Sequence, residues 1–368
     1  MIFTAELKKA RAADSPASTT VELPIGPYKM LDILDKLRLH EQETIIWEIT
    51  DYHLFEELEP LLDKTGAFFE LNALAWRLME LDEAQSTAFA GLLAMEDAKG
   101  PIPLPRLIDL AYSTQSCHVL GDAPSGSQPD RTRASEKVVF VKQSRDHPGG
   151  YVSRHGDLTE AYKNLDLTPR KPEYVIRASI KYDPVAGPDV DLSQVICIDL
   201  PASEEQVRYM DVQMTGDWLG TYLYSIDSVI PQITDHILCV DSIPDLNPLA
   251  HKVAALDPAM IPAYKALLEA AGCRDYAGAE RLIDTLDQYS FYPHFVSPAD
   301  VAKEELLIIT AEDNAQTLLP YLNLHEYGEA LIQKSGGVLT SYGLIERKDG
   351  QPIQSPGQEQ TGGGMTLA

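Results

Sequence analysis

Residues Glu70 to Asp82 read Glu-Leu-Asn-Ala-Leu-Ala-Trp-Arg-Leu-Met-Glu-Leu-Asp, and a second apolar run follows up to Met95. A counterpart of this stretch begins at Asp245 and ends at Ala270. Apolar residues three and four positions apart lie on one face of a helix, so each copy is predicted to contain an amphipathic helix. The matching apolar positions are all 175 residues apart: Leu71, Leu74, Ala75, Leu78 and Leu81, against Leu246, Leu249, Ala250, Val253 and Leu256.

A second helix is predicted directly after the first in each copy. Asp82 and Asp257 stand where an N-cap belongs, with Gln85 in the reciprocal position of a capping box and Pro258 at the first helical position. Each copy therefore reads as helix, tight turn, helix. Two unrelated amphipathic hairpins could look alike, but an offset that stays constant across two helices favours an internal duplication.

The duplication begins before these helices, because each half of the chain shows the order strand, strand, helix, strand. These segments are 2–7, 19–23, 27–39 and 44–50 in the first half, and 174–182, 195–200, a helix opened by the capping box at 203–206, and 219–226 in the second. The predicted fold class is α+β. It consists of two tandem repeats, each a small α/β domain with an antiparallel sheet followed by a helical domain.

Composition divides the chain further. Residues 121–150 are rich in Ser, Pro, Gly, Arg and Asp and are predicted to be linker, as is the Pro-rich run that ends at Pro172. A terminal strand pair is expected over 336–347, with a weak counterpart at 149–152. The predicted organisation is a first repeat at 1–120, a divergent segment and linker at 121–172, a second repeat at 173–350 and a disordered tail at 351–368.

The charge of the chain restricts its partners. The formal net charge is −26, with 27 acidic against 18 basic residues up to residue 170 and 29 against 12 after it. Direct binding of nucleic acid or of an anionic membrane surface is therefore not expected, and basic partners are favoured. The four cysteines are scattered, and no apolar run approaches the ~20 residues of a membrane helix, so a cytoplasmic protein without a zinc cluster is expected.

Motifs that carry chemistry are absent from the sequence. It contains no glycine-rich dinucleotide or phosphate loop, no His-Glu-x-x-His and no Gly-x-Ser-x-Gly. The adjacent pair Cys117 and His118 is the one candidate nucleophile, but neighbours on a strand or helix point apart, so a buried structural cysteine is favoured. We expect no catalytic residue, no metal site and no cofactor.

Acidic residues are crowded into two tracts. From Glu41 to Glu96 there are 13 acidic residues against only Lys64 and Arg77, and from Asp191 to Asp245 there are 10 against only Arg208. Single acidic helix faces are usually just solvated, but two tracts in corresponding parts of a repeat predict a negative interaction surface. The candidate residues are Glu41, Glu43, Glu48, Asp51, Glu56, Glu57, Glu59, Asp82, Glu83, Glu204, Glu205, Asp211, Asp217, Asp227, Asp241 and Asp245.

These features resemble the antirestriction proteins of the ArdA type, which conjugative plasmids and transposons carry. The resemblance rests on the Leu-Asn-x-Leu-Ala-x-x-Leu-x-x-Leu-Asp helix followed by an acidic-apolar helix, and on the Leu-Pro strand end before an acidic capped helix. It rests also on the aromatic strands ending in Asp51 and Asp227, and on the Tyr-Gly-x-x-Leu segment with a terminal Gly-Gly strand pair. It covers most of 174–347 and, more loosely, 1–112. The whole chain also looks like longer ArdA-like proteins from mobile elements of gut Firmicutes.

The resemblance implies an elongated, acidic protein that imitates bent B-form DNA and occupies the DNA groove of type I restriction-modification enzymes. At one charge per ~1.7 Å of duplex, 26 net charges equal the phosphates of about 44 Å of DNA. The chain differs from the family's typical member, which is about half as long and dimerises. Its own negative charge is also diluted by a basic group: Arg131, Arg133, Lys137, Lys142 and Arg145.

Two other classes of function stay open. An acidic protein-interaction module of a mobile element needs no mimicry of DNA, and an enzyme would need a deep polar pocket that joins distant segments. The expected partner is a restriction-modification enzyme or another DNA-binding protein with a basic groove. The chain could act as a monomer whose two repeats replace the two subunits of a dimer, and a homodimer is the alternative.

Overall fold

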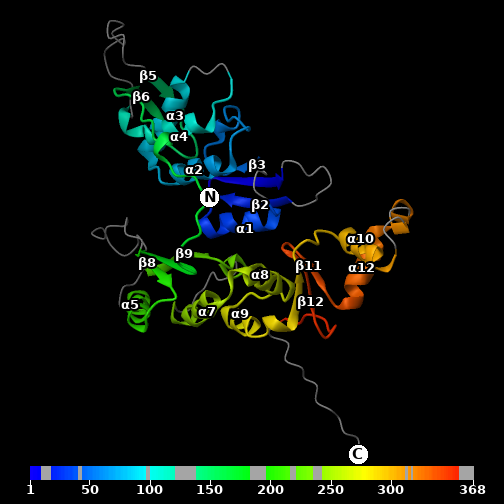
Figure 1. Ribbon diagram of the computed structural model, residues 1–368. Helices are drawn as coiled ribbons and strands as arrows, with labels where there is room; N and C mark the ends of the chain where they lie inside the picture. Colours follow the sequence, from blue (N-terminus) through cyan, green and yellow to red (C-terminus); the bar gives the residue numbers. More distant parts are fainter. Residues whose placement is uncertain are drawn as a thin grey trace, which may run out of the picture. The chain divides into compact units, whose positions relative to one another are not determined.

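The computed structural model describes residues 1–9, 18–39, 44–96, 100–120, 138–182, 196–215, 221–234, 243–310, 314–315 and 318–355. The chain forms two compact units. We call residues 1–26 and 37–170 the first unit, and residues 27–36 and 171–368 the second unit. Mixed helices and small antiparallel sheets confirm the α+β class (Figure 1).

The first unit opens with a three-stranded antiparallel sheet of β1 (Phe3–Lys9), β2 (Ser18–Leu23) and β3 (Ile45–Tyr52), in the order β2-β1-β3. Its strands alternate between the core and solvent as a half-buried sheet requires. Phe3, Ala5 and Leu7 are fully buried, and Glu48 points outward between buried Trp47 and Ile49.

Three helices follow in the first unit: α2 (Phe68–Met79), α3 (Glu83–Met95) and α4 (Leu104–Tyr112). The predicted capping box of α3 is confirmed, since the Asp82 carboxylate accepts from the Gln85 N–H at 2.7 Å and Gln85 Oε1 accepts from the Asp82 N–H at 3.2 Å. From Ser86 to Leu93 every residue of α3 is buried, so this helix is the centre of the unit.

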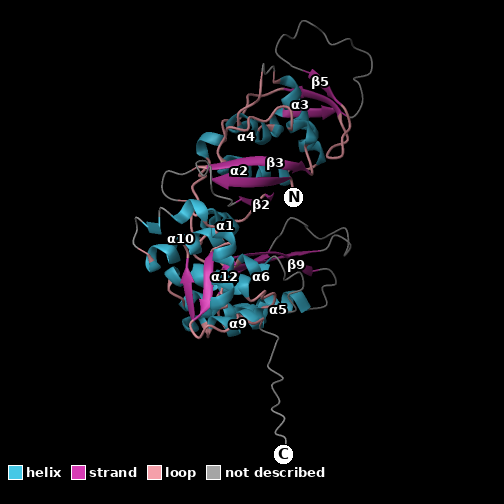
Figure 2. Cartoon of the chain, turned by 90° about the vertical axis from the view of Figure 1, so that its right-hand side faces the viewer, coloured by secondary structure: helices cyan, strands magenta, loops and turns pink. Residues whose placement is uncertain are grey.

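A second sheet covers α3. It consists of β4 (Cys117–Leu120), β5 (Val138–Val141) and β6 (Gly150–Arg154) in the order β4-β6-β5 (Figure 2). The linker prediction for 121–150 is therefore wrong over 138–141, where a strand of four residues is too short to stand out from its polar surroundings. A Cβ on Gly91 would come within 2.5 Å of Val152, so this glycine lets β6 approach α3 closely.

The second unit contains a sheet of β7 (Ile176–Tyr182), β8 (Ile196–Leu200) and β9 (Thr221–Ser228), in the order β8-β7-β9. Its helices are α1 (Pro27–Leu37, of which 27–36 group with this unit), α5 (Glu204–Thr215), α6 (Pro231–Thr234), α7 (Ile243–Ala255), α8 (Ile261–Ala270) and α9 (Tyr276–Ile283). Asp257 caps a short 3-10 turn at Pro258–Met260, and α8 starts only after it, later than predicted.

The predicted terminal strand pair exists as β11 (Val338–Thr340) and β12 (Gly343–Arg347), and β10 (Tyr289–Tyr292) completes a sheet in the order β10-β12-β11. The helices α10 (Pro298–Ile309) and α12 (Leu324–Ser335) lie between β10 and β11 in the chain. In the first half, β4 and β5 are separated by residues 121–137, which lie outside the described part, as do residues 356–368 of the expected tail.

The two halves share several features at matching positions. The sheet orders β2-β1-β3 and β8-β7-β9 correspond, as do β4-β6-β5 and β10-β12-β11. Pro24 and Pro201 both follow cis peptide bonds, and Leu71 and Leu246 are both fully buried. The superposition of residues 2–112 on 175–290 stays a prediction.

Candidate functional site

The outer face of the sheet β2-β1-β3 carries four carboxylates. The pairing register places Glu6 directly opposite Glu48, and Thr4 lies opposite both Glu22 and Asp51. Residues opposite one another share a face, and their Cβ atoms are about 4.5–5.5 Å apart. Lys8 lies on the same face and pairs with Glu6 at 3.0 Å. Four carboxylates against one ammonium leave this face strongly negative.

Like charges placed directly opposite one another destabilise a sheet. Glu6 and Glu48 therefore cost folding free energy, and among the described residues of the sheet the Lys8 contact is what offsets part of this cost. The Asp51 carboxylate lies 3.6 Å from the His53 ring, whose other nitrogen is 2.7 Å from the Thr4 hydroxyl. Asp51 and Glu48 are nonetheless exposed.

Other predicted carboxylates of the first unit lie beyond the sheet. Glu56 and Glu59 are exposed on and just after a 3-10 turn, while Glu57 is half-buried with an oxygen 3.7 Å from the His147 ring. Asp82 and Glu83 are exposed at the start of α3, where a negative charge also stabilises the helix N-terminus. These residues add to the negative surface without being reserved for it.

In the second unit, Glu204 and Glu205 are exposed in the first turn of α5, and Asp245 is exposed in α7. The Asp245 carboxylate accepts a hydrogen bond from the Tyr276 hydroxyl at 3.2 Å. The remaining predicted residues cannot be placed: Glu41, Glu43, Asp217 and Asp241 lie outside the described residues, and the Asp211 side chain does too.

Asp227 differs from the prediction of an open acidic surface. Its carboxylate is half-buried, accepts a hydrogen bond from the Tyr174 hydroxyl at 2.6 Å, and accepts from the backbone N–H groups of Tyr28 and Lys29 at the start of α1. Burial raises the pKa of Asp227, although these hydrogen bonds and nearby Arg177 act in the opposite direction. Asp227 therefore caps α1 and is not free for a partner.

Arg177 and a pair of serines explain why the second unit lacks an equivalent acidic face among its described sheet residues. Ser179 lies opposite Ser225 where the first unit has Glu6 opposite Glu48. Arg177 lies opposite both Asp199 and Asp227 in the sheet β8-β7-β9, where the first unit has Thr4. Its guanidinium forms two hydrogen bonds to Asp199, at 2.6 and 2.8 Å. The acidic face is thus compensated in the second unit and largely uncompensated in the first, although the second half has the larger net charge.

Sequence reasoning missed Glu6 and Glu22, because both lie outside the crowded tracts. Only the strand register brings them beside Glu48 and Asp51. The alternation of Thr4, Glu6 and Lys8 with buried apolar residues was the available signal.

The structure offers little for catalysis in its described part. Within the described ranges, no three or more His, Cys, Asp or Glu side chains are grouped so that they could hold a metal ion. Burial raises the pKa of the Cys117 thiol, which disfavours the reactive thiolate, and the His118 ring stacks on His155 with centroids 4.0 Å apart.

A buried ionic cluster lies elsewhere in the second unit, and sequence reasoning missed it as well. Lys265 Nζ lies 2.9 Å from both Asp32 Oδ1 and Asp35 Oδ2, the Tyr342 hydroxyl donates to Asp32 at 2.8 Å, and Lys36 Nζ lies 3.0 Å from Asp32. We call these five residues the Lys265 cluster. Lys265 and Asp32 are each only 2% exposed, so this ion pair is closed to solvent and holds α1 against α8, whereas the Asp35 and Lys36 side chains are partly exposed.

No helix in the described part of the chain combines the length and the apolar character that a membrane crossing needs. Neither a protein-family model nor a curated protein sequence matches the chain.

Proposed function

We propose that the chain is a non-enzymatic mimic of DNA, which binds the basic groove of a DNA-binding protein such as a type I restriction-modification enzyme. The observation that carries the proposal is the outer face of the first sheet, where Glu6 opposes Glu48 and where Glu22 and Asp51 share the same face. A cationic partner would neutralise these carboxylates, and relief of their mutual repulsion would add to the free energy of binding. The choice of a type I restriction-modification enzyme as the partner comes from the resemblance to the ArdA family.

Electrostatic complementarity is the physical basis of such binding. Lysines and arginines that normally contact phosphates would contact these carboxylates through charge-assisted hydrogen bonds. A rigid sheet holds neighbouring carboxylates at fixed spacing, so they need no ordering when the partner binds. The net charge of −26 would also steer a basic partner towards the protein over longer distances.

The test is a protection assay in which purified type I enzyme cleaves DNA in the presence of the chain. Wild-type protein should inhibit in competition with DNA. A sheet-face variant should lose about 10- to 100-fold in inhibitory strength, because each exposed pair contributes up to ~1 kcal/mol. That variant is Glu6→Gln, Glu22→Gln, Glu48→Gln and Asp51→Asn.

The matched control removes the same charge from other exposed places and should inhibit nearly as well as the wild type. It is Glu173→Gln, Asp287→Asn, Glu326→Gln and Glu329→Gln. Equal inhibition by both variants would show that the position of the sheet-face carboxylates is irrelevant. Binding that does not compete with DNA would instead support the second candidate, an acidic interaction module without mimicry.

A further inference from the structure

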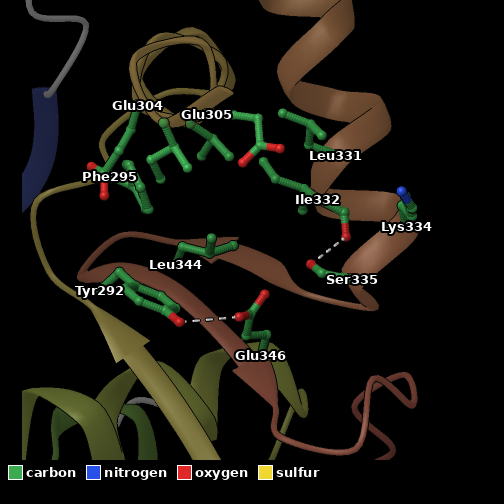
Figure 3. Close-up of a pocket in the computed structure, with 12 residues that line it drawn as sticks. Tyr292, Phe295, Glu304, Glu305, Leu331, Ile332, Lys334, Ser335, Leu344 and Glu346 are labelled. Atoms are coloured by element: carbon green, nitrogen blue, oxygen red, sulfur yellow. Dashed lines mark hydrogen bonds between the residues drawn. The ribbon is translucent and has the colours of Figure 1, made fainter. Parts of the chain in front are cut away.

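The second unit contains a pocket of about 400 Å³ beneath α10 (Figure 3). The figure looks almost down the axis of α10, which forms the roof, while α12 descends along one side and β12 lies below. The two helices approach closely at Gly328, where an added Cβ would clash with the Pro298 carbonyl oxygen. The lining residues of α12 lie C-terminal to Gly328, from Leu331 to Ser335, so the pocket opens beyond this contact.

The walls of the pocket are apolar and its charges are mostly negative. Ile308, Leu331 and Leu344 line it together with three carboxylates and the single ammonium of Lys334. Figure 3 shows the carboxylate of Glu305 entering from the roof and that of Glu346 rising from the floor, whereas Lys334 points away. The site therefore suits an apolar group that carries a positive charge.

The two facing carboxylates are not neutralised within the described part of the unit. Glu346 accepts a 3.3 Å hydrogen bond from the Tyr292 hydroxyl but forms no ion pair there, and Glu305 has no hydrogen bond or ion pair among the described residues. The third carboxylate, Glu304, already contacts the His294 ring at 2.9 Å. Glu305 and Glu346 are thus the groups available to a cation.

Further apolar side chains are exposed on α10 next to the pocket, which favours an occupant larger than a small molecule. Ile308 is 72% exposed, and its neighbours Leu307 and Ile309 are 49% and 58% exposed without lining the pocket. Exposed apolar side chains that gather beside a pocket are typical of protein interaction sites. The central strand β12 is already paired on both sides, so a partner must insert side chains and cannot add a strand here.

We infer that this pocket binds a basic amphipathic helix of another protein, with its apolar residues against α10 and α12 and a lysine or arginine between Glu305 and Glu346. Helices of this type commonly lay their apolar face into such grooves. A second copy of the chain is disfavoured because both copies carry a charge of −26, and the chain's own residues 351–368 contain no lysine or arginine. The inference does not depend on the proposed mimicry of DNA.

The test uses the full chain and a fluorescent synthetic helix of leucine and lysine, roughly 18 residues or five turns long, with all leucines on one face. Binding is measured by fluorescence anisotropy. We expect Glu305→Gln with Glu346→Gln to weaken binding about tenfold or more, since both charge-assisted contacts are lost. The side-chain amide introduced by Glu346→Gln keeps an acceptor for the Tyr292 hydroxyl, and circular dichroism checks that the fold is retained.

Two further variants separate the pocket from general charge attraction. Glu326→Gln with Glu329→Gln removes the same charge from α12 outside the pocket and should change the affinity by no more than about twofold. Ile308→Ser should weaken binding without unfolding the protein, because this side chain is mostly exposed.

Three results would overturn the inference. Equal weakening by both double variants would mean that the peptide binds by net charge alone. A short alkylamine that binds as tightly as the peptide would assign the pocket to small amphipathic cations. Self-association of the wild-type chain that Ile308→Ser abolishes, measured by sedimentation, would assign the surface to a second copy.

Discussion

Lys265 and Ala90 occupy matching positions, 175 residues apart, in the buried helices α8 and α3. A lysine is almost never fully buried unless it is paired, and here Asp32 and Asp35 provide the pairing. Burial disfavours the ionised carboxylate of Asp32, but the ammonium groups of Lys265 and Lys36 and the bonds from Lys265 and Tyr342 outweigh it and lower its pKa. Sequence could not reveal this pair, because 233 residues separate Lys265 from Asp32.

Replacing Asp32 by Asn should lower the free energy of unfolding by about 3–5 kcal/mol, because it leaves the buried Lys265 without its main counter-charge. Adding Lys265→Met to this variant should recover most of the loss, since the uncompensated ammonium is then gone. Urea unfolding of the wild type, the single variant and the double variant provides the measurement. A single variant within ~0.5 kcal/mol of the wild type would show that Asp35 alone suffices.

The lowered pKa of Asp32 also predicts a pH dependence. An unfolded Asp titrates near 3.9, so on acidification the unfolded chain takes up this proton before the folded chain does. The contribution of Asp32 is therefore complete above about pH 4 and is lost as the pH falls through the lower folded pKa. The stability difference between the wild type and the Asp32→Asn, Lys265→Met variant should therefore be constant above about pH 4 and should shrink as the pH falls further. A difference that stays constant below about pH 4 would contradict the linkage.

At the scale of elements, long periodic segments were predictable and short ones were not. The helices α2 and α7 and the strands around them follow from apolar spacing alone, because each buries one continuous face. The strand β5 has only four residues and depends on β6 and α3 for its partners. The helix α10 was missed because exposed Leu307, Ile308 and Ile309 break the amphipathic pattern that would identify it.

The contact between α3 and β6 yields an element-scale prediction. Gly91→Ala adds a methyl group within 2.5 Å of Val152, and overpacking of this kind costs typically about 1–3 kcal/mol, against roughly 1 kcal/mol gained in helix propensity. We expect a lower melting temperature for Gly91→Ala. The double variant with Val152→Ala should lose less stability than the sum of the losses in the two single variants. If the effects of the two substitutions on the melting temperature are strictly additive, β6 moves away from α3 and the two side chains do not compete for space.

For the whole molecule, composition predicted the acidity but not its distribution. The second half has the larger excess of acidic residues. In its sheet, however, Arg177 pairs with Asp199, and the Asp227 carboxylate caps α1, so part of that charge is already compensated. The uncompensated face in the first unit depends on strand register, which no count of residues contains. The unit boundaries also differ from the sequence-based division, because residues 27–36 group with 171–368.

Net charge predicts opposite effects of salt on folding and on binding. Self-repulsion destabilises a compact chain of charge −26, so raising NaCl from about 10 to 150 mM, which shortens the Debye length from ~30 to ~8 Å, should raise the melting temperature. The same change should weaken a complex with a basic partner. A melting temperature that falls with salt would indicate that attractive ion pairs outweigh the repulsion.

Because α1 groups with the second unit, it must fold against partners that the ribosome makes much later. The ribosome makes Lys265 233 residues after Asp32, and Tyr342 follows Asp32 by 310 residues. At roughly 5–20 residues per second, the full set of partners emerges about 15–60 s after α1. During that interval α1 has none of these partners, while residues 37–170 are completed and can associate with residues 1–26. The second unit can therefore close around α1 only after translation has passed Tyr342.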